Sequence, residues 1–404
     1  MSEEVNETHD KVLNPTVVKL GFVSLLADIS SEMLYPITPL FLTGILGASM
    51  LSVGLIEGVA EVIASTLKFY SGKWSDRIIK RKPFIGAGYL ISALAKPLIG
   101  ISTTWIGVLF ARGFDRTGKG LRGAPRDALL SESVPERFRG QAFGWHRAMD
   151  TLGAAIGPLI AVIYLTYFSA DLRSIYFIAL IPGLAAVAVV MSIKEKKSGA
   201  EFVKKRSAGP KLRLREISRD FKIYLLSWGI FSLVNSSDVF LLLKAKESGL
   251  ELNTVIFMYC FYNLTYALMS PYFGKLSDRV PRKKVLAFGL LIFCLVYLGF
   301  SFSTSNWHYW FLFGIYGLYM AATDGVGKAL AVDLVSAEHK ASGLGLLSAV
   351  TGVASVVAST MAGLLWDKFG SGWAFLYGSF GALCSIFLLL LIRRGQVPPL
   401  MSQR

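Results

Sequence analysis

Acidic side chains occur inside apolar stretches of this 404-residue chain, where a charge is costly to bury. Asp28 and Glu32 stand four residues apart in one stretch, and Glu57 and Glu61 repeat that spacing in the next. Residues four apart share a face of a helix, so each pair must point away from lipid. Carboxyl groups in such a position can exchange a proton for a cation. The pattern predicts proton-linked binding of a solute and indicates that the chain is not an enzyme.

Basic side chains gather in the apolar stretch centred near residue 118. Arg112, Asp115 and Arg116 fall on one arc of a helix, and the same arc also holds Lys119 and Arg126. Because an uncompensated buried charge costs several kcal/mol, we expect the acids of the first, second and fifth apolar stretches to neutralise these cations. Lipid cannot cover that side of the helix.

The run from Gly113 to Gly120 imitates a phosphate-binding loop, but Gly120 stands where that loop needs Ser or Thr and no strand precedes it. Nucleotide hydrolysis is therefore excluded, and an ion gradient must drive any uphill transport. No spacing of His, Cys, Asp and Glu is typical of a metal site, so we expect neither a metal nor a cofactor.

His146 and Asp150 form another i, i+4 pair, in the stretch centred near residue 154. An imidazole beside a carboxylate can change its charge near neutral pH, which a proton-coupled carrier could use. The alternative is that His146 is a buried structural residue. Both roles stay open at the level of sequence.

Twelve apolar stretches of about 20 residues must position these side chains, since about 20 residues are needed for a helix to cross a bilayer. They are centred near residues 30, 62, 92, 118, 154, 183, 233, 264, 293, 320, 353 and 382. The chain is 53% hydrophobic with a mean hydropathy of +0.52, which excludes a soluble protein of this size. We predict an all-α, multi-pass membrane protein with twelve transmembrane helices.

The net charge of +15 is concentrated in short connections, above all in residues 194–222, which hold eleven basic and four acidic residues. The connections near residues 45–52, 100–105 and 301–306 hold no Lys or Arg. Basic loops stay in the cytoplasm, so both termini are expected there and a nucleic-acid partner is not. The predicted organisation is an N-terminal tail (1–15), a six-helix half (16–193), a basic linker (194–222), a second six-helix half (223–394) and a C-terminal tail (395–404).

A six-residue pattern after the second stretch recurs 202 residues later, after the eighth. The sequence GKWSDR at residues 72–77 is matched by GKLSDR at 274–279. The shared positions used below are Gly72, Asp76 and Arg77 in the first copy and Gly274, Asp278 and Arg279 in the second. Repeats of six helices are one architecture of secondary transporters, so we predict two pseudo-symmetric halves.

These two hairpins resemble the signature of the major facilitator superfamily, and the resemblance covers essentially the whole chain. A second match resembles the family's antiporter motif and consists of Gly144, Gly153, Gly157 and Pro158. The motif is incomplete, because Ala161 and Val162 occupy the places of its final glycine pair. The resemblance implies the major facilitator fold, hairpins that gate the cytoplasmic side, a flexing fifth helix and proton-coupled export.

We therefore expect a secondary transporter that works by alternating access and exports a small amphipathic or cationic compound in exchange for protons. Its partners would be that solute, protons and the lipid bilayer of a bacterial inner membrane, and it would act as a monomer. One alternative is proton-linked transport of an anionic solute, a carboxylate or phosphate, bound by cations such as Arg112 and Arg116. A more remote alternative is a membrane receptor that transports nothing.

Overall fold

The computed structural model describes residues 14–78, 80–135, 139–168, 171–193, 218–335 and 340–392. The described part of the chain is helical and contains no strand. The predicted tails fall almost entirely outside these residues, and so does the predicted linker up to residue 217.

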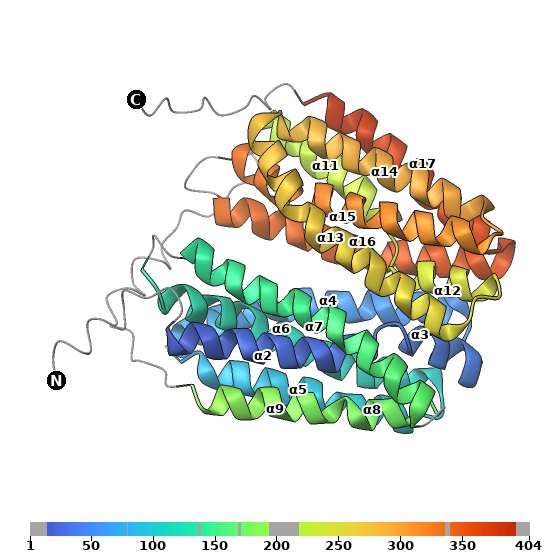
Figure 1. Ribbon diagram of the computed structural model, residues 1–404. Helices are drawn as coiled ribbons and strands as arrows, with labels where there is room; N and C mark the ends of the chain where they lie inside the picture. The colour runs from blue at the N-terminus through green and yellow to red at the C-terminus, as the bar shows by residue number, and fades with distance from the viewer. Residues whose placement is uncertain are drawn as a thin grey trace. The chain divides into compact units, whose positions relative to one another are not determined.

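Six predicted spans of the first half fall on nine helical segments (Figure 1). They are α2 (Pro15–Glu32), α3 (Thr38–Leu40), the π-helix η1 (Phe41–Ile45), α4 (Met50–Ile78), α5 (Lys82–Ile101), α6 (Trp105–Glu132), α7 (Arg139–Tyr167), α8 (Ser174–Ile178) and α9 (Leu180–Met191). The second half consists of α11 (Arg219–Val234), α12 (Val239–Glu247), α13 (Leu252–Arg279), α14 (Arg282–Phe302), α15 (Asn306–Asp333), α16 (Lys340–Phe369) and α17 (Ser371–Leu390).

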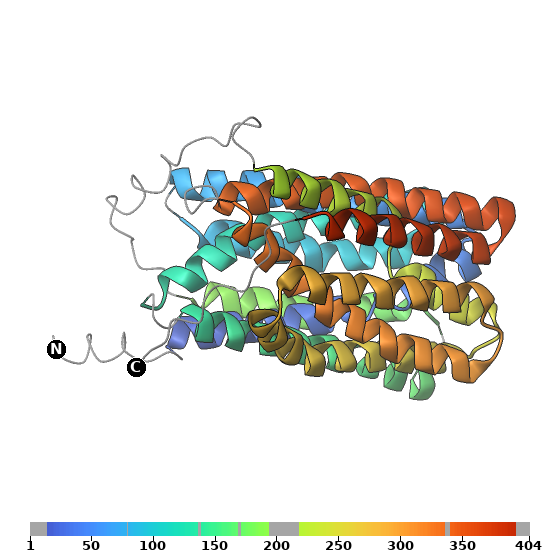
Figure 2. The same cartoon turned by 90° about the horizontal axis from the view of Figure 1, so that it is seen from above.

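The packing of the helices repeats between the two halves. In the first half α2 packs against α7 and α9, and α5 packs against α6 and α9. In the second half α11 packs against α16 and α17, and α14 packs against α15 and α17. Each helix of one set corresponds in chain order to a helix of the other, and Figure 2 shows the same helices from above. The predicted pseudo-symmetric repeat of six helices is thereby confirmed.

The chain forms two compact units, and one short segment of the first half packs with the second unit. Ser49–Gly58 belongs with the second half rather than the first. These residues begin α4, whose first backbone N–H groups donate to the carboxylate of Asp367 at the end of α16, from Met50 at 3.0 Å and Leu51 at 2.8 Å. A charged cap satisfies donors that a helix start leaves open. The first two turns of α4 are therefore anchored on α16.

Eight of the described helical segments are long and apolar enough to cross a membrane. They are Met50–Gly72, Lys82–Ile101, Trp145–Tyr167, Ser174–Met191, Arg219–Glu247, Arg282–Phe302, Gly343–Phe369 and Ser371–Leu390. The other four predicted spans fall on α2, α6, α13 and α15. Of these, α6 departs furthest from an apolar span, because it holds eight charged residues, more than any other described helix of the first half.

Two predicted spans are interrupted helices. In the first span, α2 ends at Glu32, and Pro36 and Pro39 follow within two turns. Each proline removes one backbone N–H donor, and two prolines so close together weaken the helix at this point. In the seventh span, α11 ends at Val234 and α12 begins at Val239, with four polar residues between them. Breaks in membrane helices occur where the backbone lines a cavity or is buried in protein.

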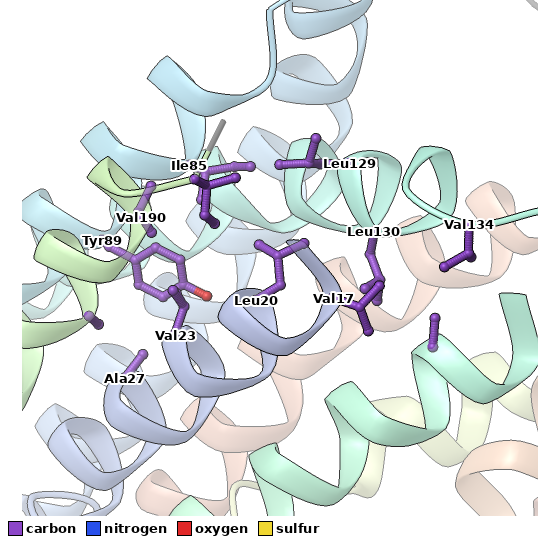
Figure 3. Packing of buried hydrophobic residues seen from close by; sticks show 13 residues of the cluster. Val17, Leu20, Val23, Ala27, Ile85, Tyr89, Leu129, Leu130, Val134 and Val190 are labelled. Atoms are coloured by element: carbon purple, nitrogen blue, oxygen red, sulfur yellow. The ribbon is translucent and has the colours of Figure 1, made fainter. Parts of the chain in front are cut away.

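A buried apolar cluster holds together the start of α2, the start of α5 and the end of α6 in the first unit (Figure 3). Val17 and Leu20 of α2, Tyr89 of α5 and Leu130 of α6 are at most 3% exposed. Burying a side chain of this size stabilises the fold by about 1.5–3 kcal/mol. The cluster fixes α2 against α5 and α6, and these helices carry most of the charged groups described next.

Candidate functional site

Two carboxyl groups from different helices meet inside the first unit. The side chains of Asp28 on α2 and Asp150 on α7 are hydrogen-bonded to each other. The hydroxyl of Ser24, one turn before Asp28, donates to Asp150 Oδ1. Two carboxyl groups in contact repel each other unless one of them holds a proton. Asp150 Oδ2 also lies 3.6 Å from Nη1 of Arg147, so one cation stands beside this acid pair.

Glycines on α7 allow this approach of the helices. A Cβ atom at Gly153 would lie 2.7 Å from the carbonyl oxygen of Leu25 and 2.8 Å from Cβ of Asp28. At Gly157 it would lie 2.8 Å from the carbonyl oxygen of Ile29 and 3.1 Å from Cβ of Glu32. Small residues are what permit helix backbones to approach closely in membranes. Two positions of the antiporter-like motif therefore pack directly beside the predicted acids.

The other two positions of the antiporter-like motif also lie in α7. Pro158 lies inside α7, as predicted for a helix that can bend. Gly144 also lies in α7, but its surroundings are outside the described part of the structure.

The charges of α6 are compensated partly within that helix. Asp115 Oδ2 lies 3.9 Å from Arg112 Nη1 and 4.0 Å from Arg116 Nε, and all three side chains are largely buried. Lys119 instead interacts electrostatically with Glu61 of α4 and Asp28 of α2. The prediction that acids of other helices neutralise this arc is therefore incomplete, because Asp115 takes the two arginines.

Other cations of this unit have structural contacts. Arg122 donates to Ser92 Oγ at 2.6 Å, and its guanidinium lies 4.4 Å from the ring centroid of Tyr89. Lys96, which is 4% exposed, donates to the hydroxyl of Ser30 on α2. These contacts join α5 to α6 and to α2. They favour a packing role for both cations.

His146 is buried, and its Nε2 atom has no hydrogen-bond partner. It interacts electrostatically with Arg126, Asp127 and Asp150. No hydrogen bond or ion pair of the described residues joins its ring to Asp150. The imidazole thus lies beside the acid pair of Asp28 and Asp150 but is not bonded to it.

The two glutamates of α4 belong to different compact units. Glu61 accepts from Ser65 at 3.3 Å and interacts with Lys119 in the first unit. Glu57 lies in the segment that packs with the second unit, where it interacts electrostatically with Asp238. One helical stripe in the sequence therefore contributes to two separate charge clusters.

The repeated hairpins have equivalent ion pairs. Arg81, just before α5, lies 3.0 Å from Glu132 at the end of α6. Arg282, which begins α14, lies 2.5 Å from Asp333 at the end of α15. In both halves an ion pair thus joins the hairpin to the end of the following long helix, α6 in the first half and α15 in the second.

Only some residues of the repeated hairpin motif lie in the described part of the structure. Gly72 lies close to α6, because a Cβ atom there would be 3.2 Å from Cβ of Ala124, whereas Gly274 has open space. Arg279 is exposed. The side chains of Asp76, Arg77 and Asp278 are outside the described part of the chain, so their gating role stays a prediction.

We expect Arg81→Ala to lower the stability of the protein by about 2 kcal/mol, because it leaves a partly buried carboxylate without its donor. Arg282→Ala should cost about 1 kcal/mol or less, since that ion pair is more exposed, at 19% and 38% against 9% and 29%. Melting temperatures in detergent compare the two variants. Equal shifts would show that burial does not decide the strength of these pairs.

Sequence reasoning missed a second cluster, around Asp238. This residue stands at the break between α11 and α12, and its carboxylate accepts hydrogen bonds from Tyr316 at 2.5 Å and Tyr262 at 2.9 Å. The sequence carries a signal for this cluster, since Tyr259, Tyr262 and Tyr266 recur at helical spacing. In the same unit, Asp324 and Lys328 form an ion pair at 2.6 Å.

Membrane helices in two repeated units, with acids and cations placed inside them, define a multi-pass membrane transport protein. The chain belongs to the Major Facilitator Superfamily, whose family model matches residues 20–255 and 223–403. Membership in this superfamily, predicted from the hairpin signature, is confirmed. Because it is a family of transporters, the prediction that the chain is not an enzyme is confirmed as well.

Relatives and solved structures agree with this assignment. An uncharacterized MFS-type transporter of Methanocaldococcus jannaschii is 37% identical over 393 residues, which is 96% of this chain and 97% of that protein. The multidrug resistance protein MdtG of Citrobacter koseri is 24% identical and covers 77% of each chain. The crystal structure of the nucleoside transporter NupG is similar with a TM-score of 0.79 at 12% identity, covering 94% of this chain and all of that one.

Proposed function

We propose that this transporter exchanges protons for a small amphipathic or cationic organic compound and moves that compound out of the cell. The observation that supports the proposal is the hydrogen-bonded pair of Asp28 and Asp150. Two carboxyl groups in contact cannot both be ionised without strong repulsion. The pair therefore has to hold a proton or to gain another positive charge.

Proton loss is expected to separate the pair. Once both groups are ionised, they repel each other across the interface of α2 and α7. Gly153 and Gly157 allow the two helices to approach closely at this interface. Rebinding of a proton restores the contact. Proton occupancy can thus bias α2–α7 packing, and a carrier that alternates between two access states needs an element with two arrangements.

The name of one relative supports export. The Citrobacter protein is called a multidrug resistance protein, and the match to it extends over most of this chain. The partial antiporter motif on α7 supports the same direction. We further propose that both termini and the repeated hairpins lie on the cytoplasmic side of a bacterial inner membrane and that the monomer is the working unit.

Energised inside-out vesicles that contain the chain test the proposal. A pH-sensitive dye reports proton leak when ethidium, tetraethylammonium or another organic cation is added. We expect cations to cause proton leak in vesicles that contain the protein and none in vesicles without it. A complete panel of cations without any leak would contradict proton-coupled export.

A second candidate is transport of an anionic solute, and one observation favours it. Cations outnumber acids along α6, and the buried Nε atom of Arg116 has no hydrogen-bond partner. Guanidinium groups bind carboxylates and phosphates with two parallel hydrogen bonds. In the same vesicles, leak caused by benzoate or phenyl phosphate but not by cations would make this candidate the better account.

A further inference from the structure

The break in the seventh span brings polar groups into the interior of the second unit. Between α11 and α12 stand Asn235, Ser236, Ser237 and Asp238. Some of the freed groups find partners within the unit, since Ser237 N donates to Ser359 Oγ at 3.2 Å. Interrupted helices of secondary transporters commonly surround a binding site near the middle of the bilayer.

The carboxylate of Asp238 is oriented but has no resident counter-ion. Tyr262 and Tyr316 each donate to a different oxygen of the group, at 2.9 Å and 2.5 Å. Hydroxyl donors hold a carboxylate in place without supplying a positive charge. Among the described residues, no Lys, Arg or His forms an ion pair with Asp238, and its electrostatic neighbour Glu57 is another acid.

Asp324 in the same unit provides the contrast. Its carboxylate also accepts from a tyrosine, Tyr266, at 3.0 Å. Unlike Asp238, it has its own cation, because Lys328 Nζ lies 2.6 Å away. Since an intramembrane charge is expensive when uncompensated, Asp238 needs either a proton or a cation from outside the chain.

The surroundings of Asp238 suit an organic cation. The rings of Tyr259 and Tyr262 are 5.2 Å apart at 87°, and those of Tyr316 and Tyr319 are 5.1 Å apart. Aromatic rings attract cations and bind apolar groups. The amide of Asn235 donates to the Tyr319 hydroxyl at 3.3 Å, while its buried Oδ1 atom has no hydrogen-bond partner. A further acceptor is therefore available in the same cluster.

We propose that Asp238 is the counter-ion for the transported molecule, a monovalent organic cation with an aromatic or apolar body. The inference rests on the proposed export of such compounds and assigns the recognition of their charge to the second unit. A bare metal cation is a poorer fit, because hard cations need six or more oxygen ligands and the tyrosine hydroxyls here act as donors. Proton and substrate would thus be held by different acids, Asp28 with Asp150 and Asp238.

Binding of tetraphenylphosphonium to the purified full-length protein in detergent tests this assignment. Equilibrium dialysis against protein-free micelles gives the specific binding. We expect Asp238→Asn to weaken binding by about tenfold or more, because the substitution removes the charge that would pair directly with the ligand. Asp238→Glu keeps the charge and should bind within about threefold of the wild-type protein.

The matched control is Asp324→Asn, which removes a carboxylate of the same unit that has its own lysine and should change binding by about twofold or less. The charge-reversed probe tetraphenylborate has nearly the same shape and should not compete. If Asp238→Asn does not elute as a single folded species, Asp238→Ser tests the same point with a second neutral side chain.

Unchanged binding in the neutral variants, or equal competition by tetraphenylborate, would overturn the assignment. The measurement requires no gradient and no transport, so it is separable from the proposed exchange. Binding through Asp238 without proton leak in vesicles would refute the exchange alone. Proton leak driven by cations that bind equally well to Asp238→Asn would refute only the role of Asp238.

Discussion

Asp28→Asn is expected to reduce substrate-driven proton leak in inside-out vesicles to the level of vesicles without the protein, a loss of about tenfold or more. An amide cannot take up or release the proton that Asp28 shares with Asp150. The substitution has nearly the same shape as the carboxyl group, and the amide can still hydrogen-bond to Asp150. The loss should therefore come from chemistry and not from unfolding.

Asp150→Asn should have the same effect, because the two groups form one pair. The control is Asp171→Asn, a carboxylate outside the long helices whose described contacts are local, such as the 2.9 Å bond from Arg173 N. It should leave transport at the wild-type level. A wild-type leak in Asp28→Asn, measured at equal protein content in the vesicles, would remove this pair from the proton path.

Gly153→Ala should both destabilise the protein and abolish transport. The new methyl group would stand 2.7 Å from the carbonyl oxygen of Leu25, well inside van der Waals contact, so α7 and α2 would have to separate. Overpacking of this kind costs about 1–3 kcal/mol. We expect a lower melting temperature in detergent together with a loss of transport, because separation also pulls Asp150 away from Asp28.

Gly345→Ala is the matched control for this prediction. Gly345 lies in α16, which packs against α11 as α7 packs against α2, and a methyl group there would meet no atom within 4 Å. Alanine is the better helix former, so this variant should be as stable as the wild-type protein or slightly more so. If Gly153→Ala melted and transported like Gly345→Ala, close packing of α2 and α7 would not be needed for function.

Much of the architecture could be predicted from the residues alone. Long apolar stretches have one stable solution in a bilayer, the helix, so hydropathy and length were enough to locate the spans. The recurrence of GKWSDR as GKLSDR predicted the repeat that the packing of α2 with α7 and of α11 with α16 confirms. The exceptions are the interrupted spans, where Pro36 and Asp238 stand inside apolar patterns that conceal a break in the helix.

The partners of the charged groups could not be predicted in the same way. A helical projection shows which residues share a face, but it contains no information on the helix that the face meets. It placed Glu57 and Glu61 on one stripe, whereas they belong to different charge clusters. It likewise contains no information on the contact of Asp238 with the hydroxyls of Tyr262 and Tyr316, because the break that brings them together is a tertiary feature.

The sequence by itself determined that this protein is a helical membrane transporter with a repeat, since burial of apolar side chains in lipid and the satisfaction of backbone hydrogen bonds depend on local composition. Tertiary structure alone decided which charges are compensated. Asp115 is neutralised by two arginines of α6, Asp28 lies against Asp150, and Asp238 is held by tyrosines without a cation. The physical reason is that electrostatic compensation acts over a few ångströms between helices far apart in the chain.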